Sequence, residues 1–555
     1  MKKIKVGLIV DKADQTYLNY DLYLRSLGSN NYIISCLIIQ GKPDNNGKYG
    51  IKNLISMMVK GRGLGYLISK ILFVIIDKIE TLLIGKRYEK INCRYPLSLF
   101  KVDFISVVPV VSDSGFVYRY TESDINLIKE IDLDVLVRGG SGILRGEILN
   151  VCKYGVLSFH HANNEVNRGG PPGFWEVFNK ESSTGFVIQR LTEELDGGAV
   201  IFKASIPTSR IYKLNQNRLY AKSSVFMHRA LEGLGVNDGF GVIFEKHPYS
   251  YRLYRLPNAI DIIKYLYRVY FALIFDVLTK IIGLQYRWGV AYQIRKDWRD
   301  VVLWKSKIIK NPPNRFFADP FAIEKNNRKI IYVEDFDYRV GKGKITALEI
   351  SDCGEKILGT ALEEQFHLSY PFLFEDGDNL YMIPETHQSN DIRVYKCVDF
   401  PLGWKLHKIL IDNVSAADTI MFRHNGKFWL MTNLDSAGMD DHCSELHIYS
   451  ADSFDSDAWN PHPLNPVIFD SACARNGGFI YSEDKLYRVY QSQEFKIYGA
   501  SIGVAEIIYI GLDNYEERLV SNIRARFFEN IVGTHTFTFG SGVLCVDFSR
   551  YQNIK

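Results

Sequence analysis

The 555-residue chain lacks paired cysteines. Its eight cysteines lie singly, with no CxxC pair, at Cys36, Cys93, Cys152, Cys353, Cys397, Cys443, Cys473 and Cys545. A disulfide framework or a zinc ribbon would bring cysteines together in the sequence. The scatter therefore argues against both and predicts a reduced, cytoplasmic protein without a metal site.

The chain also lacks a strong charge of either sign. Its 67 basic and 63 acidic side chains leave a net charge of +4, which gives no reason to expect a nucleic-acid partner. Apolar residues make up 46% and charged residues 23%, so intrinsic disorder and a collagen-like structure are excluded. At roughly 100–200 residues per domain, the length predicts two to four domains.

Long apolar runs are missing as well. At the N-terminus, the run Val6–Val10 is too short for a signal peptide and Asp11 follows it at once. The run Ile71–Ile76 and the interrupted stretch 259–284 both fall short of the roughly 18–20 apolar residues that a membrane span requires. We therefore predict no membrane-spanning helix.

Two amphipathic helices are predicted instead. In an insertion at about residues 51–85, apolar side chains recur at helical spacing, at Ile71, Leu72, Ile75, Ile79, Leu82 and Leu83. A second helix is expected over Asn258–Leu284, inside a helical linker at 246–287. The first helix could pack on its own domain and the second could dock the two domains. Either could instead lie on the inner face of a membrane, and the sequence leaves this choice open.

Residues 1–245 alternate between strand and helix patterns. The predicted strands are Lys5–Val10, Tyr32–Ile39, Phe104–Val111, Leu133–Val137 and Gly155–Phe159, and the helices between them include Tyr17–Leu27 and Glu122–Glu130. Continuous apolar strands separated by helices predict an α/β domain with a mostly parallel sheet. In such sheets ligands bind beyond the carboxyl ends of the strands, so polar residues at those ends are the site candidates.

From about residue 288 the pattern changes to short aromatic strands with turn signals such as Asn425-Gly426 and Gly477-Gly478. Polar anchors recur every 48 to 60 residues, at Asp319, Tyr370, Asp418, Arg475 and His535. About 50 residues suit one four-stranded propeller blade. Residues 288–555 are therefore predicted to form an all-β, five-bladed propeller.

The segment 155–201 carries the densest chemical signal. Ser158 and His160 lie two apart on a predicted strand, so their side chains face the same side. A loop with Arg168 follows, and Asp196 comes 36 residues after the histidine. A histidine with a nearby carboxylate and hydroxyl can move protons and stabilise a developing oxyanion. A structural role for the trio is equally open at this point.

Four ordered motifs in this segment resemble the catalytic domain of folate-dependent formyltransferases. They are Ser158-Phe159-His160, where the family has Asn-x-His, then Arg168-Gly169-Gly170-Pro171-Pro172, Thr184-Gly185-Phe186-Val187 and Leu195-Asp196-Gly197-Gly198. The resemblance covers roughly residues 107–204. It implies 10-formyltetrahydrofolate as the donor and a primary amine as the acceptor.

The resemblance also implies roles for individual residues. His160 would polarise the formyl group, Asp196 would orient the imidazole, and Ser158 would replace the family's asparagine. The loop Arg138, Gly139, Gly140 and Ser141 would line the folate pocket together with Gly197. Substrate contacts are expected from His161, Asn163 and Arg168.

The predicted propeller resembles the invertase, levansucrase and arabinanase superfamily, and more closely that of plant glucosamine inositolphosphorylceramide transferases. In the hydrolases acidic residues meet at the axis, and the matching candidates are Asp319, Glu334, Glu385 and Asp418. Arg475 and His535 would hold these carboxylates ionised, which disfavours hydrolysis. The two cations would instead bind an acidic acceptor, with Tyr370 stacking on a sugar. Alternatively, these residues bond one blade to the next.

The sequence thus predicts formyl transfer to a nucleotide- or lipid-linked amino sugar in surface-polysaccharide biosynthesis. The enzyme would be cytoplasmic, with possible peripheral contact at the inner membrane face. Two other classes compete with this prediction: glycosyl transfer or hydrolysis by the propeller, and a non-catalytic glycan-binding scaffold. The acceptor sugar and the oligomeric state are not predicted.

Overall fold

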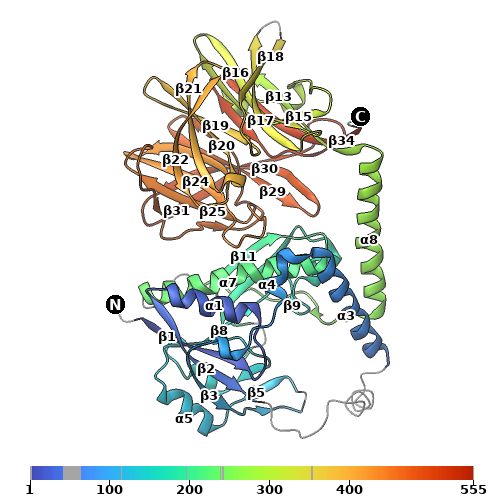
Figure 1. Ribbon diagram of the computed structural model, residues 1–555, viewed down its shortest axis with the longest axis vertical. Coiled ribbons are helices and arrows are strands. Elements are labelled where there is room, and N and C mark those ends of the chain that lie inside the picture. The colour runs from blue at the N-terminus through green and yellow to red at the C-terminus, as the bar shows by residue number, and fades with distance from the viewer. Residues whose placement is uncertain are drawn as a thin grey trace. The chain divides into compact units, whose positions relative to one another are not determined.

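The structure is a computed structural model that describes residues 3–41, 64–113, 115–194, 197–237, 239–240, 243–351 and 354–553. The chain forms two compact units, unit 1 (Met1–Phe271) and unit 2 (Ala272–Lys555) (Figure 1). The division between them falls inside the predicted linker 246–287. None of the described cysteines is in a disulfide.

Unit 1 is built on a seven-stranded sheet. The strands lie in the order β11 (Ala199–Pro207), β10 (Ser183–Arg190), β8 (Val156–His160), β6 (Val135–Arg138), β1 (Ile4–Asp11), β2 (Tyr32–Gln40) and β3 (Asp103–Val107). The five strands from β8 to β3 run parallel, and β10 and β11 are antiparallel additions at one edge. The predicted α/β class with a mostly parallel sheet is confirmed.

Helices cover both faces of this sheet, which explains why its central strands read as continuous apolar runs. Ile125 and Ile128 of α5 (Glu122–Glu130) pack with Ile9 and Leu136 of the sheet. Helices α1 (Tyr17–Gly28) and α7 (Tyr212–Asn237) pack on each other and lie across the sheet from α5 (Figure 1). The remaining elements of unit 1 are α4 (Glu89–Asn92), α6 (Phe174–Asn179), β4 (Val110–Val111), β5 (Val117–Arg119), β7 (Ile143–Arg145), β9 (Arg168–Gly169) and β12 (Leu253–Tyr254).

Both predicted amphipathic helices are present. The first is α3 (Leu64–Ile84), and the part of the predicted insertion at 51–63 lies outside the described residues. The second is α8 (Ala259–Ile281), which starts in unit 1 and ends in unit 2. No helix in the described ranges is long and apolar enough to cross a membrane.

Unit 2 is all-β, as predicted. Its described residues form five antiparallel sheets. Four follow one another along the chain: β15 (Arg315–Lys325) to β18 (Gly354–Leu362), β19 (Ser369–Asp376) to β22 (Gly403–Asp412), β23 (Ala416–His424) to β27 (Ile468–Phe469), and β28 (Asn476–Ser482) to β31 (Tyr515–Arg524). The fifth joins β13 (Leu284–Ile294) and β14 (Lys307–Ile308) to β32 (Ile531–Gly533), β33 (Phe537–Gly540) and β34 (Val543–Asn553).

The remaining strands of these four sheets are β16 (Arg328–Asp337), β17 (Lys342–Ser351), β20 (Asn379–Glu385), β21 (Asp391–Asp399), β24 (Lys427–Leu434), β25 (Glu445–Ala451), β26 (Asn460–Pro461), β29 (Lys485–Glu494) and β30 (Ile497–Ile510). The first strands of the sheets pack in a closed series: β15 on β19, β19 on β23, β23 on β28, β28 on β33, and β33 back on β15. We call this series the ring. It supports the predicted five-bladed propeller.

Of the two predicted turns, Asn425-Gly426 is a turn and Gly477-Gly478 is not. Asn425 and Gly426 both have positive φ, 50° and 78°, between β23 and β24, as a tight two-residue hairpin turn requires. Gly477 and Gly478, however, lie inside β28 rather than in a turn. A Cβ atom on either would come within 2.3 Å of a backbone carbonyl oxygen, of His535 and Phe537 respectively. These glycines are therefore needed for close strand approach.

Candidate functional site

The carboxyl ends of four parallel strands bring the predicted residues of unit 1 to one edge of the sheet. Asp11 ends β1, Gln40 ends β2, Arg138 ends β6 and His160 ends β8. Within β8, Ser158 lies opposite Arg138 of β6 and Gln189 of β10. The edge where ligands bind in such sheets is therefore the edge that carries the predicted catalytic residues.

The imidazole of His160 is held by the loop that follows it. The side chain is only 8% exposed, and its Nε2 lies 3.0 Å from the carbonyl oxygen of Asn167. A carbonyl can only accept, so Nε2 carries the proton and donates it. The Asn167 amide in turn donates to Oε1 of Glu176 at 2.9 Å, and burial raises the pKa of Glu176. Asn167 and Glu176 were missed by the sequence analysis.

The structure describes only one of the other two predicted catalytic residues, Ser158 and Asp196. Ser158 is 2% exposed, and its hydroxyl donates to the carbonyl oxygen of Phe159 at 3.1 Å. Asp196 lies outside the described residues. The neighbouring Gly198 donates its N–H to Oε1 of Gln189 at 3.2 Å, which ties this segment to β10. The catalytic roles of all three residues stay predictions.

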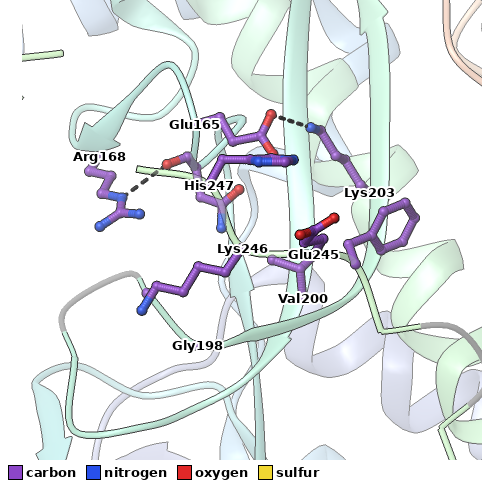
Figure 2. A pocket seen from close by; sticks show the side chains of 11 residues that line it. Glu165, Arg168, Gly198, Val200, Lys203, Glu245, Lys246 and His247 are labelled. Atoms are coloured by element: carbon purple, nitrogen blue, oxygen red, sulfur yellow. Dashed lines mark hydrogen bonds and ion pairs between the residues drawn. The ribbon is translucent and has the colours of Figure 1, made fainter. Parts of the chain in front are cut away.

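A small cationic pocket lies beside this segment (Figure 2). Its lining includes Asn164, Glu165, Arg168, Gly197, Gly198, Val200, Lys203, Phe244, Glu245, Lys246 and His247. Lys203 pairs with Glu165 at 2.6 Å, while Lys246 and Arg168 both pair with Glu194. The pocket thus contains two of the predicted ligand residues, Arg168 and Gly197, and its three cations are balanced by glutamates.

His161 and Asn163, both predicted to contact substrate, are used within the fold. His161 Nε2 lies 3.0 Å from the hydroxyl of Ser223, and its ring stacks on Phe159. Burial lowers the pKa of His161 to about 3, so the ring is neutral. The Asn163 side chain accepts from the N–H of Glu165 at 3.1 Å and shapes the loop. Their substrate role stays a prediction.

The loop 138–141 is held by two neighbouring strands. Asp11 accepts from both the N–H and the hydroxyl of Ser141 at 3.0 Å. Gln40 donates to Asp11 and to the carbonyl oxygen of Ser141, each at 2.8 Å. Gly140 allows this packing, since a Cβ atom there would lie 2.6 Å from Gln40 Nε2. Arg138 donates to the carbonyl oxygen of Gly142. An anionic ligand at this loop would compete with the Asp11 carboxylate.

In unit 2 the repeat predicted from the anchors has a backbone signature. Asp319, Tyr370 and Asp418 have φ of 49°, 46° and 47°, and each lies in an interruption of the strand register. Positive φ is rare for non-glycine residues, so its recurrence marks equivalent positions in three sheets. In the fourth sheet the interruption lies between Asn476 and Gly478. Gly477 therefore occupies the equivalent place, and the predicted anchor Arg475 lies two residues earlier.

Arg475 nevertheless reaches the centre of the ring. Its Nε lies 2.6 Å from Oδ2 of Asp418, and its Nη2 lies 3.2 Å from Oε2 of Glu385. The guanidinium also lies over the ring of Tyr498, at 5.1 Å from the centroid. Gln491 donates to the same Asp418 oxygen at 3.0 Å. Arg475 thus joins two sheets, as the alternative of bonds between blades predicts.

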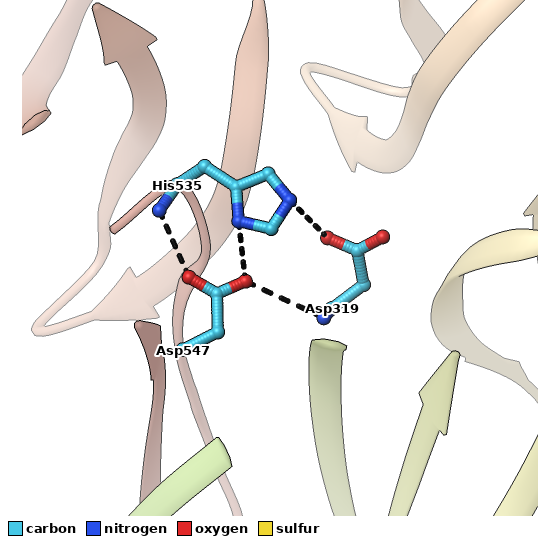
Figure 3. A group of neighbouring side chains, drawn as sticks. All are labelled: Asp319, His535 and Asp547. Carbon is cyan, nitrogen blue, oxygen red and sulfur yellow. Dashed lines mark hydrogen bonds and ion pairs between the residues drawn. The ribbon is translucent and has the colours of Figure 1, made fainter. Parts of the chain in front are cut away.

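His535 forms a second buried cluster of charged groups in the ring, with Asp319 and Asp547 (Figure 3). Its Nδ1 lies 2.5 Å from Oδ2 of Asp547, and its Nε2 lies 3.4 Å from Oδ1 of Asp319. Burial opposes a positive charge, but these two carboxylates outweigh it and raise the pKa of His535. The ring also stacks on Trp288 at 4.0 Å. Asp547 and Trp288 were missed, because neither stands next to a predicted anchor.

Tyr370 corrects one expectation. Its side chain is 0% exposed and packs edge-on against Phe321, with 4.9 Å between the ring centroids. No face of the phenol ring is open to a sugar, because the neighbouring sheet covers it. The predicted stacking of Tyr370 on a sugar is therefore wrong for this conformation.

The carboxylates of the ring differ in protonation. Burial raises the pKa of Asp319, Glu334 and Asp418 above their usual values, although cations face Asp319 and Asp418. Burial also opposes ionisation of Glu385, but the hydrogen bond from His387 and the charge of Arg475 lower its pKa. At Glu385 the cations thus favour the ionised form, as expected, whereas at Asp418 the effect of burial works against Arg475.

Three histidines adjoin these carboxylates, and the sequence analysis did not single them out. His387 Nδ1 lies 2.7 Å from Glu385 Oε1, and His367 Nε2 lies 3.5 Å from Glu334 Oε1. The rings of His367 and His442 both lie next to the ring of His387. The hydrogen bond to Glu385 raises the pKa of His387, whereas burial lowers that of the other two. Histidines and carboxylates that can exchange protons thus lie next to one another in the ring.

Comparisons with known proteins agree with both resemblances. Residues 299–530 match the family model described as "Glucosamine inositolphosphorylceramide transferase 1, N-terminal". The chain is 33% identical over 211 residues to glucosamine inositolphosphorylceramide transferase 1 of Arabidopsis thaliana, covering 37% of this chain and 27% of that protein. The chain thus spans about a quarter of the length of this relative.

The N-terminal region is similar to formyltransferases. Methionyl-tRNA formyltransferase of Bacillus subtilis is 27% identical over 248 residues, covering 43% of this chain and 71% of that protein. Among solved structures, a family 117 glycoside hydrolase of Zobellia galactanivorans matches with 11% identity and a TM-score of 0.32, over 48% of this chain and 90% of that one. The chain thus joins a formyltransferase-like α/β unit to an all-β unit. The latter resembles the N-terminal region of glucosamine inositolphosphorylceramide transferases.

Proposed function

We propose that the chain is a transferase whose unit 1 moves a formyl group from 10-formyltetrahydrofolate to the amine of an amino sugar. The observation that carries this proposal is the place of His160, at the carboxyl end of β8 with its Nε2 proton directed at the Asn167 carbonyl oxygen. The sequence similarity to methionyl-tRNA formyltransferases supports the same chemistry. The acceptor would be a nucleotide- or lipid-linked amino sugar of surface-polysaccharide biosynthesis.

Three basic side chains of the pocket, Arg168, Lys203 and Lys246, are the candidates for the carboxylates of a folate tail. Each already pairs with Glu165 or Glu194, so the tail would have to displace these glutamates. When bound, 10-formyltetrahydrofolate supplies a formyl carbon that an amine can attack. His160 would donate its Nε2 proton to the formyl oxygen instead of to Asn167, and stabilise the negative charge that develops there. The acceptor amine must be neutral to attack.

We further propose that unit 2 binds the glycan acceptor through the ring. Four carboxylates, those of Asp319, Glu385, Asp418 and Asp547, pair with the two cations that the sequence singled out, and Glu334 pairs with His367. Because Arg475 and His535 already face carboxylates, an amino or hydroxyl group suits the ring better than a phosphate does. The name of the plant relative, a glucosamine transferase, supports an amino sugar.

The test is a donor and acceptor assay on the full chain. The protein is incubated with 10-formyltetrahydrofolate and a panel of nucleotide amino sugars, and tetrahydrofolate release and formylated sugar are measured together. Wild-type protein should form both products in equal amounts, and His160→Ala should form neither. Tetrahydrofolate release that persists in His160→Ala would overturn the assignment. His407→Ala, on β22 of unit 2 where the imidazole pairs with Asp455, serves as the histidine control.

A second function, glycosyl transfer or hydrolysis in the ring, is favoured by one observation. Glu385 has a lowered pKa and Asp418 a raised one, so the two carboxylates differ in their tendency to keep a proton. Cleavage of a glycosidic bond requires such a pair. If the full chain releases sugar from glycosides, and Asp418→Asn abolishes this release while His160→Ala does not, the ring is the catalytic centre. Retained glycan binding without either reaction would indicate a scaffold.

The place of action belongs to the same proposal. We propose that the chain works in the cytoplasm and contacts the inner face of a membrane peripherally. A lipid-linked acceptor would be presented there.

A further inference from the structure

Both acidic residues of α3 are engaged by other parts of unit 1. Glu80 of α3 is 0% exposed and accepts from the hydroxyl of Tyr265 at 2.6 Å and from the N–H of Lys213 at 2.7 Å. Asp77, one turn earlier, pairs with the Lys213 ammonium at 2.9 Å. These are the two acidic residues of α3. The carboxylates of Asp77 and Glu80 therefore bind groups inside unit 1 and do not form a polar, water-facing side of the helix.

The outward side of α3 is apolar. Ile68, Ile71, Ile75, Ile79 and Leu82 follow one another at spacings of three or four residues and are 42 to 81% exposed. A soluble helix normally buries such a stripe and exposes its polar side. Helix α3 instead leaves this stripe exposed along about four turns.

Helix α8 also carries an apolar stripe on its outward side. Ile260, Ile263, Tyr267 and Phe271 recur at the same spacing in the part that belongs to unit 1 and are 57 to 67% exposed. The inward side of this part instead carries Ile262, Tyr265 and Val269, which are buried. We call the nine outward side chains of α3 and α8 named here the apolar face.

The exposed charges of both helices have one sign. Lys70 and Lys78 of α3 and Lys264, Arg268 and Lys280 of α8 are exposed. The acidic residues of α8 are less exposed and engaged: Asp261 accepts from the N–H of Asn258, and Asp276 pairs with Lys496 at 3.3 Å. Among the described residues of the two helices, the exposed charges are therefore positive, whereas Asp77 and Asp261 are half-buried.

We infer that the apolar face lies in the interfacial region of an anionic lipid bilayer. Large exposed apolar patches mark interaction surfaces, and an apolar stripe bordered by lysine and arginine is the pattern of helices that lie in the membrane interface. Long basic side chains reach the headgroups while their stems stay in the apolar layer. A second copy of the chain fits less well, because a symmetric dimer through this face would bring lysines against lysines.

This inference rests on the peripheral contact proposed above and adds the surface, its orientation and the lipid charge. It does not depend on the transfer chemistry. The buried Glu80 contacts explain the orientation, because they fix which side of each helix can face outward.

The test is flotation of the full chain with vesicles of phosphatidylcholine alone or mixed three to one with phosphatidylglycerol. Wild-type protein should float with the anionic vesicles at least about fivefold better than with the neutral ones, and less at 0.5 M than at 0.1 M salt. Ile79→Ser with Leu82→Ser should reduce flotation on both vesicle types. Lys70→Glu with Lys78→Glu should reduce only the anionic preference. Leu127→Ser on α5 and Val340→Ser, which remove exposed apolar side chains elsewhere, are the controls.

Each of the other outcomes would refute a specific part of the inference about the membrane. Equal flotation on both vesicle types would refute the role of lipid charge and leave peripheral contact standing. Flotation that is unchanged in Ile79→Ser with Leu82→Ser would refute the apolar face. Absence of flotation, with concentration-dependent dimers that this variant abolishes, would assign the face to a second copy and refute both the inference and the peripheral contact. None of these results bears on formyl transfer, which is measured without vesicles.

Discussion

Arg475 donates through its Nε to Oδ2 of Asp418 at 2.6 Å in the ring of unit 2. Only 12% and 4% of the two side chains are exposed. The same guanidinium reaches Glu385, so one cation serves two carboxylates from neighbouring sheets. Removing one partner of a buried pair leaves an uncompensated charge and costs more than the pair itself contributes.

Replacement of this cation should therefore destabilise unit 2. We expect Arg475→Ala to lower the free energy of unfolding by about 3–5 kcal/mol, measured by urea denaturation. Arg339→Ala is the matched control, since Arg339 is 67% exposed in its pair with Asp337 and should cost less than about 1 kcal/mol. Arg475→Ala should also weaken acceptor binding several-fold without changing folate binding. Equal stability of the two variants would contradict the structural role of Arg475.

The buried His535 predicts a pH dependence of stability. Its pKa is raised in the folded protein by Asp547 and Asp319, against the effect of burial. A raised folded pKa stabilises the protein fully below the unfolded value, about 6.5, and this contribution is lost as the pH rises through the folded pKa. The melting temperature should therefore fall between pH 6 and pH 9.

The matched variant for this effect is His535→Gln, which keeps a polar side chain but cannot carry the charge. It should be less stable than wild type at pH 6, and its melting temperature should change less between pH 6 and pH 9. Part of the wild-type slope will remain, because the raised pKa values of Asp319, Glu334 and Asp418 act in the same direction. An unchanged slope in the variant would exclude His535 as a contributor.

Asn167 is predicted to position the loop that holds His160. Its backbone carbonyl oxygen accepts from the imidazole of His160, and its side-chain amide donates to the buried Glu176. We expect Asn167→Ala to lower kcat about tenfold, equivalent to about 1.4 kcal/mol, with little change in KM. Asn167→Asp should be less stable than Asn167→Ala, because it sets a second carboxylate against Glu176.

The control for this prediction is Asn179→Ala, at the exposed end of α6, which should leave kcat and stability unchanged. Steady-state kinetics and thermal unfolding of the three variants separate positioning from folding. A proportional loss of folded protein and of kcat in Asn167→Ala would show a purely structural role.

The elements that the sequence predicts well are those with a local signal. The apolar runs of β1, β2 and β8 and the helical spacing in α3 each lie within about 20 residues, and side-chain periodicity reports on them directly. The repeat in unit 2 is detected for the same reason, since each copy holds a polar residue next to an apolar strand.

Partners that come from distant parts of the chain could not be predicted. Asp11 accepts a hydrogen bond from the N–H of Ser141, 130 residues away in the sequence. Asp547 accepts one from the N–H of Asp319, 228 residues away. A single sequence shows that Arg475 and His535 are basic, but not that carboxylates already surround them. The burial of Tyr370 likewise depends on the packing of one sheet on the next.

The last prediction concerns Glu80, whose carboxylate holds α3 and α8 on unit 1. It accepts from Tyr265 at 2.6 Å and Tyr270 at 3.2 Å through one oxygen, and from the N–H of Lys213 at 2.7 Å through the other. Removing it leaves these donors without their acceptor in a buried place, and each such donor costs about 1–3 kcal/mol. Glu80→Ala should therefore destabilise unit 1 by more than about 2 kcal/mol.

Tyr265→Phe removes only one of the three donors and should cost about 0.5–1.5 kcal/mol, the usual net contribution of one hydrogen bond. Tyr267→Phe is the matched control on the same helix, because this ring is 67% exposed on the outward side. Thermal unfolding ranks the variants, and limited proteolysis reports whether α3 detaches. We expect cleavage within α3 to be fastest in Glu80→Ala, intermediate in Tyr265→Phe and as slow as in wild type in Tyr267→Phe. If Tyr265→Phe and Tyr267→Phe behave alike, the Glu80 contacts do not determine which side of α3 and α8 faces outward.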